Sequence, residues 1–178
     1  MTTGYKLTDA TDQTHGGCQW GENVTHETNG EGDLCGSGWL HCYSDPYLAV
    51  LLNPIHADFR EYHLWVCEGG GTLKNDNGLK LGYTRLTTIK RIDPPKVTPE
   101  HRVRFGILSA QHVYADADWN RWADSWLSGA DRSAKAARAA EARAAEAAWA
   151  AVRAADAAPI DLIALAREAC EVTEGGAE

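Results

Sequence analysis

The chain has 178 residues, of which 44% are hydrophobic, and this composition argues against wholesale disorder. Its formal net charge is −8. Neither residues 1–130 nor residues 131–178 are basic, so the charge excludes the positive surface that nucleic-acid binding normally needs. The sequence shows no apolar run long enough to cross a membrane and no apolar segment near its start that would direct secretion. We therefore expect a cytoplasmic protein that binds neither nucleic acid nor membrane.

Short strands and loops dominate the predicted elements of the first part of the chain. Residues 8–38 are rich in Gly, Thr, Asn and Asp, which favours loops with brief extended pieces. Asp45 and Pro46 are typical of a helix start, where a carboxylate caps free N–H groups and proline needs none. We expect Asn53-Pro54 to end this helix. The sequence thus predicts strands at residues 4–7, 39–43 and 62–68 and a helix at residues 46–52.

A run of glycines at residues 69–71 is expected to end the third of these strands. Asn77-Gly78 is a strong turn signal. Between residues 79 and 92 the apolar side chains alternate loosely, which predicts two more strands with a break near Thr84.

Helical patterns dominate the rest of the chain. Thr98-Pro99 predicts the start of a helix that reaches about residue 114, and a second helix is expected at residues 116–127. The second helix carries three tryptophans on one face, which we interpret as packing residues. Between residues 134 and 158, 16 of 25 residues are alanine, the strongest helix former. A last helix is predicted at residues 160–172.

These patterns predict an α+β protein in two parts. Residues 1–130 should form a head with a small mixed or antiparallel β-sheet and short helices, on which the helices at 98–114 and 116–127 pack. Residues 131–178 should form an all-helical, alanine-rich tail. Because alanine buries little apolar area, we interpret this tail as a spacer or as an element through which the chain forms a homo-oligomer.

Cysteine and histidine side chains are the candidates for metal binding or nucleophilic catalysis. The cysteines are Cys18, Cys35, Cys42, Cys67 and Cys170. Their odd number predicts reduced thiols, and no C-x2-C pair of the kind that zinc sites use is present. Cys35 or Cys42 with His41 or His26 would be needed for a catalytic dyad, but His41 and Cys42 are neighbours on one strand and should point to opposite faces. We expect no metal.

One resemblance covers most of the chain. The segments GCQWG, LCGSGWLH, DPYLAVLLNPIHA and WLSGADRS resemble a family of uncharacterised phage and prophage proteins, as does the alanine-rich tail; they lie at residues 17–21, 34–41, 45–57 and 126–133. The resemblance implies a phage or prophage accessory protein, which would work in the cytoplasm of the host cell. It implies no particular activity.

A second resemblance concerns the fold alone. Residues 38–45 lead from a strand into a helix and resemble part of ADP-ribosyltransferase-like domains, in which such a segment borders a nicotinamide site. The resemblance implies a ligand site formed by Lys6, His26, His41, Tyr43 and Ser44. One departure is that the late strand, expected at residues 87–92, lacks the glutamate that orients the ribose in that fold.

The function that follows from these observations is a non-catalytic binding module for a host protein or a nucleotide-like ligand, without a cofactor. An NAD-using enzyme of the ADP-ribosyltransferase type is the alternative, and a zinc-stabilised structural protein is a second alternative. Fold alone does not decide among them, because one fold serves many functions.

Overall fold

A computed structural model describes residues 2–112, 115–133 and 160–171. It confirms the α+β class, with antiparallel sheets and helices in the described residues. The contacts divide the chain into two units, Met1–Lys96 and Val97–Glu178. This division comes earlier than the boundary predicted after residue 130, because the helices that follow residue 97 pack on one another. The expected packing of these helices on the head stays a prediction.

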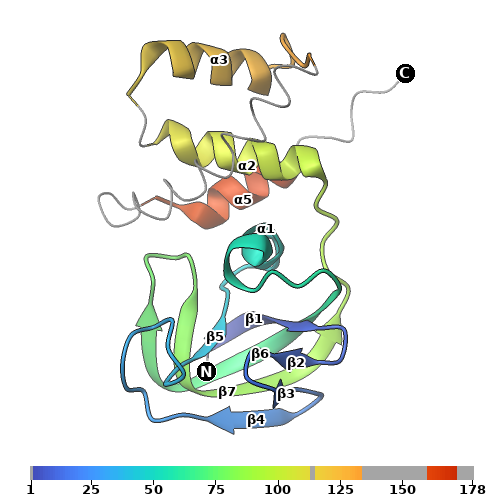
Figure 1. Cartoon of the computed structure of the whole chain (residues 1–178), viewed down its shortest axis with the longest axis vertical. Helices are drawn as coiled ribbons and strands as arrows, with labels where there is room; N and C mark the ends of the chain where they lie inside the picture. Colours follow the sequence, from blue (N-terminus) through green and yellow to red (C-terminus); the bar gives the residue numbers. More distant parts are fainter. Residues whose placement is uncertain (1, 113–114, 134–159, 172–178) are drawn as a thin grey trace. The chain divides into compact units, whose positions relative to one another are not determined.

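The N-terminal unit is built on one curled antiparallel sheet (Figure 1). Its strands in spatial order are β1 (Thr2–Asp9), β6 (Tyr62–Asn75), β7 (Leu81–Ile92) and β4 (Val24–Glu27). A further strand, β5 (Leu40–Cys42), pairs with the first residues of β7, and β4 pairs with the residues that follow them. A bridge between Tyr5 and Tyr43 joins β1 to the end of β5. Because β5 pairs with β7 and also meets β1, the sheet closes on itself, and the three strands predicted from the sequence lie in it together. A small second sheet contains β2 (Gln13–Thr14) and β3 (Cys18–Gln19).

The two central strands are longer than predicted. β6 continues through the glycine run to Asn75, and β7 is one strand without a break at Thr84, so both expected interruptions are wrong. The register shifts between Gly70 and Leu73, where Gly71 has a φ of 71°. Such a bulge takes up an extra residue without ending the pairing, and glycine accepts this backbone conformation without steric cost.

Helix α1 (Pro46–His56) begins as predicted and ends later than predicted. The Asp45 carboxylate accepts hydrogen bonds from the backbone N–H groups of Tyr47 and Leu48. The expected end at Asn53-Pro54 is wrong, because proline lies in the last turn, where its missing N–H removes a single hydrogen bond. The Asn53 side chain, still within the helix, fixes the segment that follows by exchanging two hydrogen bonds with the backbone of Phe59.

The two faces of the curled sheet have different coverings. The first, here called the Trp20 face, packs around the buried Trp20 ring; its buried residues include Leu40, Cys42, Cys67, Tyr83 and Leu86. The second, here called the α1 face, is the side on which α1 lies, next to β1 (Figure 1). Since side chains alternate along a strand, His41 points to the face opposite its neighbours Leu40 and Cys42.

The described part of the C-terminal unit is helical. It contains α2 (Pro99–Gln111), α3 (Ala117–Leu127) and α5 (Leu162–Glu171), and α2 contacts both of the others. Trp126 is buried against Val103 and Ile107 of α2, which confirms the packing role expected of the tryptophan face. The alanine-rich helix expected at residues 134–158 lies outside the described residues. No helix within the described ranges is long and apolar enough to cross a membrane.

Candidate functional site

The predicted site residues Lys6 and His41 meet through the Lys6 side chain and the His41 backbone, and their two side chains do not touch. Lys6 Nζ donates a hydrogen bond of 2.9 Å to the backbone carbonyl of His41. Lys6 lies on the Trp20 face, with its ammonium 4.3 Å from the centre of the Trp20 ring, whereas the His41 imidazole points to the α1 face. The two side chains therefore lie on opposite faces of the sheet, and a single ligand cannot contact both from one side.

Lys6 is an internal residue of the N-terminal unit. Its side chain is 5% exposed, and burial lowers its pKa while the nearby thiols of Cys42, Cys67 and Cys18 act in the opposite direction. Burial disfavours an ammonium ion, and the Trp20 ring and the His41 carbonyl are the groups that stabilise it. Lys6 thus fixes β5 and Trp20 from within the sheet, a structural task.

His41 anchors the loop that precedes β5. Its Nε2 donates to the backbone carbonyl of Leu34, and its Nδ1 has no hydrogen-bond partner among the residues that the structure describes. The pKa of His41 is lowered, first by burial and then by the positive charges of Lys6 and Lys80, with the Leu34 carbonyl acting against them. His41 is therefore a neutral imidazole at neutral pH.

Tyr43 brings a second histidine to the same face. Its hydroxyl lies 3.2 Å from His56 Nδ1 at the end of α1, and the two rings are nearly parallel, 5.9 Å apart. Burial raises the pKa of Tyr43. The pKa of His56 is lowered to about 4 by burial and by the charges of Lys80 and His41. His56 Nε2 has no hydrogen-bond partner in the part of the chain that the structure describes.

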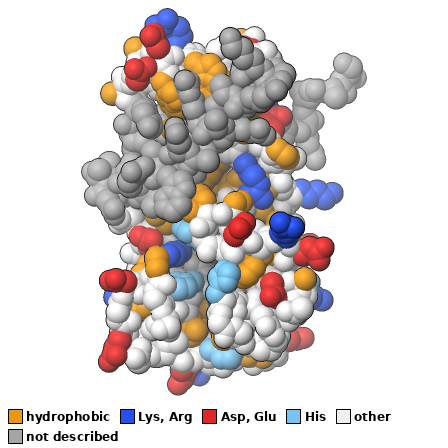
Figure 2. Space-filling view, in the orientation of Figure 1, with side chains coloured by type: hydrophobic (Ala, Val, Ile, Leu, Met, Phe, Trp, Pro, Cys, Tyr) orange, Lys and Arg blue, Asp and Glu red, His pale blue; other side chains and the backbone are white. Residues whose placement is uncertain are grey.

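Lys80 and Cys35 complete this group of side chains. Lys80 is 8% exposed, and its Nζ lies 2.8 Å from the Sγ of Cys35, which is at the surface. Within the described residues, no carboxylate forms an ion pair with Lys80. We call this group the β5 cluster; its members are Cys35, His41, Tyr43, His56 and Lys80. Figure 2 shows histidine side chains gathered on one face of the N-terminal unit.

The remaining two predicted residues do not belong to the β5 cluster. His26 lies on β4, where its Nε2 is 2.7 Å from the Gln19 carbonyl and its ring meets the Trp20 ring edge-on at 4.5 Å. Ser44 is half-buried between Tyr43 and the helix cap Asp45. Of the five residues that the sequence predicted for a ligand site, the structure thus brings His41 and Tyr43 into the β5 cluster, and their role in binding stays a prediction. Cys35, His56 and Lys80 were not among the predicted residues.

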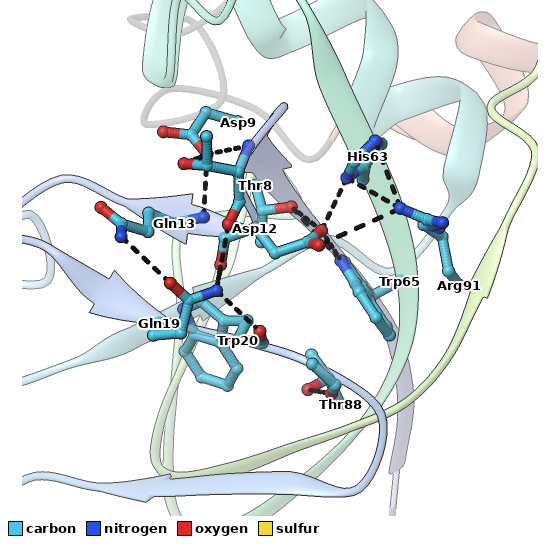
Figure 3. A network of polar contacts seen from close by, with 12 residues as sticks. Thr8, Asp9, Asp12, Gln13, Gln19, Trp20, His63, Trp65, Thr88 and Arg91 are labelled. Atoms are coloured by element: carbon cyan, nitrogen blue, oxygen red, sulfur yellow. Dashed lines mark hydrogen bonds and ion pairs between the residues drawn. The ribbon is translucent and has the colours of Figure 1, made fainter.

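A second network of polar side chains lies on the other side of the sheet from the β5 cluster, near Trp20 (Figure 3). Asp12 Oδ1 accepts hydrogen bonds from Trp65 Nε1 at 3.2 Å and from His63 Nδ1 at 2.6 Å. Arg91 lies beside both, 4.0 Å from the other Asp12 oxygen. The Asp12 carbonyl accepts from the Trp20 backbone N–H at 2.8 Å. This network fixes the loop that carries Trp20 to β6 and β7, and its groups satisfy one another.

Comparison with known proteins adds no assignment. In the described ranges, no three His, Cys, Asp or Glu side chains are arranged to hold a metal ion. No protein-family model, curated protein or solved structure matches the chain. The resemblances to phage proteins and to ADP-ribosyltransferase-like domains stay predictions.

Proposed function

We propose that the N-terminal unit is a binding module for an anionic, nucleotide-like small molecule, and that the β5 cluster is its site. The observation that carries the proposal is the environment of Lys80. This nearly buried ammonium has a thiol as its hydrogen-bond acceptor and two imidazoles close enough for its charge to lower their pKa. Buried charges are normally paired, so the cluster favours a ligand that supplies the missing negative charge.

The surrounding charge supports this choice. Residues 1–96 contain eight Lys and Arg against twelve Asp and Glu, yet no carboxylate is among the groups that shift the pKa of His41 or His56. A local excess of positive charge in an acidic unit attracts an anion, such as a phosphate. The ring nitrogens of His41 and His56 that have no partner among the described residues add hydrogen-bonding groups of the kind that nucleotides use.

Calorimetric titration of the full chain tests the proposal with ADP, ATP, ADP-ribose and NAD as ligands. We expect at least one of them to bind with a Kd below about 1 mM. Replacement Lys80→Met should weaken the binding about tenfold or more, because the phosphate loses its cation. The matched control is Lys90→Met, which removes the same charge from an exposed position on β7. Absence of binding by all four ligands would contradict the proposal.

Proton uptake gives an independent reading of where the ligand binds. An anion beside Lys80 offsets the positive charge that lowers the pKa of His41 and His56, so their protonated forms become more favourable. Titrations at pH 6 in two buffers with different ionisation enthalpies should therefore show protons taken up on binding. Equal heats in both buffers would place the ligand elsewhere.

The two alternatives drawn from the sequence have their own readouts. Release of nicotinamide from NAD during the same titrations would favour the NAD-using enzyme over a binding module. Metal analysis of the purified chain decides the zinc alternative, since a structural site requires close to one equivalent of zinc.

A further inference from the structure

We propose that Cys35 is a covalent modification site, whose thiol exchanges with small anionic disulfides under the influence of Lys80. The inference does not depend on a nucleotide-like ligand, although both use the β5 cluster. It starts from a contrast among the cysteines. Cys35 is exposed, Cys18 and Cys170 are half-buried, and Cys42 and Cys67 are fully buried in the Trp20 face.

The position of Cys35 is determined by hydrogen bonds of the loop around it. His41 Nε2 donates to the carbonyl of Leu34, the residue before Cys35. Immediately after Cys35, the backbone N–H of Gly36 donates to the Asp33 carbonyl at 2.8 Å and closes a turn. Together these contacts hold the sulfur over the Lys80 ammonium while one side of the thiol stays open to solvent.

Lys80 is suited to assist a reaction at this sulfur. Its ammonium is nearly buried and already donates to Sγ at 2.8 Å. Its position beside Sγ places a positive charge where the carboxylate of an anionic disulfide must approach in order to react. Cysteines that react in proteins lie in such partly exposed, electropositive surroundings, whereas buried thiols are inert.

The chemistry is a balanced exchange that needs no external oxidant. The Cys35 sulfur attacks one sulfur of the disulfide, a new S–S bond forms to it, the original S–S bond breaks, and the other half leaves as a thiolate. Once Cys35 is in a mixed disulfide, the Lys80 ammonium still has no negative group beside it among the described residues. A carboxylate on the bound half can provide it, which is why the geometry favours an anionic disulfide over a neutral one.

The experiment compares two disulfides on the full chain. One is the dianionic dithiobis(nitrobenzoate) and the other is the neutral dithiodipyridine; release of the coloured thiol is followed by stopped flow, and mass spectrometry of peptides locates the modified cysteine. We expect Cys35 to be modified first. The ratio of anionic to neutral rates should exceed by about tenfold that of a peptide of residues 31–39, which carries the same thiol without Lys80.

Three substitutions separate the effect of Lys80 from general charge effects. Lys80→Gln should slow the anionic reaction about tenfold and the neutral reaction less, while Lys80→Arg, which keeps the charge, should restore most of the rate. Lys90→Gln makes the same change in net charge and should change neither rate by more than about twofold. The proposal is overturned if another cysteine reacts first, if the protein and the peptide show the same rate ratio, or if Lys80→Gln and Lys90→Gln behave alike.

Reversible ligand binding distinguishes this inference from the proposed function. Replacement Cys35→Ser should abolish the fast exchange, whereas nucleotide binding is measured on the unmodified wild-type chain, so the two readouts are independent. Fast exchange at Cys35 without any nucleotide binding would support the covalent site and contradict only the proposed function. Nucleotide binding with slow exchange at Cys35 would do the reverse.

Discussion

His56 is the residue whose environment makes the clearest prediction about pH. Its pKa is about 4 in the folded chain, against 6.5 for a histidine in an unfolded chain. Between these two pH values His56 is protonated in the unfolded chain but not in the folded chain. The free energy of unfolding should therefore fall as the pH falls from about 6.5 to about 4. The loss from this residue is at most about 3 kcal/mol. Urea denaturation at a series of pH values measures it.

Two substitutions isolate this effect from the titration of carboxylates. His56→Gln should flatten the fall in stability between these pH values, whatever its effect at pH 7. His15→Gln is the matched control, because His15 is exposed and its replacement should leave the profile unchanged. His41 also has a lowered pKa, so a smaller fall should persist in the His56 variant. Identical profiles for wild type and His56→Gln would show that His56 is not held neutral by the fold.

At the residue scale, the sequence indicated part of the candidate site. His41 and Tyr43 were predicted from the resemblance carried by residues 38–45, which lead from a strand into a helix; the structure has β5 and α1 there, and the ligand site stays a prediction. Lys80 was not, since its partner Cys35 lies 45 residues away and a lysine next to a turn is ordinarily solvated. Lys6 was assigned to the ligand and proved internal, because the sequence does not say on which face of the sheet its side chain lies.

At the scale of elements, Gly69 makes a prediction about how β6 passes the Tyr83 ring. A Cβ atom at Gly69 would lie 2.3 Å from Cζ of Tyr83 and nearly as close to two further ring atoms. The ring is in the packed Trp20 face and cannot move away freely. We therefore expect Gly69→Ala to lower the free energy of unfolding by about 2 to 3 kcal/mol, through overpacking, as measured by urea denaturation.

The adjacent glycine is a natural control for this substitution. At Gly70 the nearest atom to an added Cβ is Arg85 Cδ at 3.7 Å, an ordinary contact. Gly70→Ala should change stability by less than about 1 kcal/mol. Equal losses for the two variants would indicate that backbone freedom, and not the tyrosine ring, requires glycine in this strand.

The elements were predicted best where short-range signals act. The start of α1 and the Thr98 cap of α2 depend on side chains within three residues of the helix. The glycine run and Thr84 were misread as interruptions, because pairing between β6 and β7 continues on both sides of the bulge. A local propensity for turns is outweighed when pairing with a long partner strand holds the segment in the sheet.

At the scale of the whole molecule, the division after Lys96 makes a prediction about independent folding. The curled sheet, α1 and the complete β5 cluster lie within residues 1–96. A fragment of these residues should fold by itself, since its core does not draw on later residues for the Trp20 face. Its amide NMR spectrum should overlay the corresponding signals of the full chain, and its Cys35 should keep the same exchange rate.

The outcome for the fragment distinguishes two views of the domain boundary. A spectrum of the unfolded type, or loss of fast exchange at Cys35, would support the boundary after residue 130, with the helices at 98–114 and 116–127 needed for the head. In the full chain, brief trypsin treatment offers a second reading. The exposed Lys96 in the segment between β7 and α2 should be cut before any site in the strands.

The sequence by itself determined the α+β class, the starts of the helices and the presence of a sheet that contains the segments around Lys6, His41 and Trp65. These features follow from apolar periodicity and capping, which act over a few residues. Only the tertiary structure decided that the sheet closes through Tyr5 and Tyr43, that Lys6 and the His41 ring take opposite faces, and that Lys80 meets Cys35. Strand register and chain closure set those contacts, and both depend on pairing between residues that are distant in sequence.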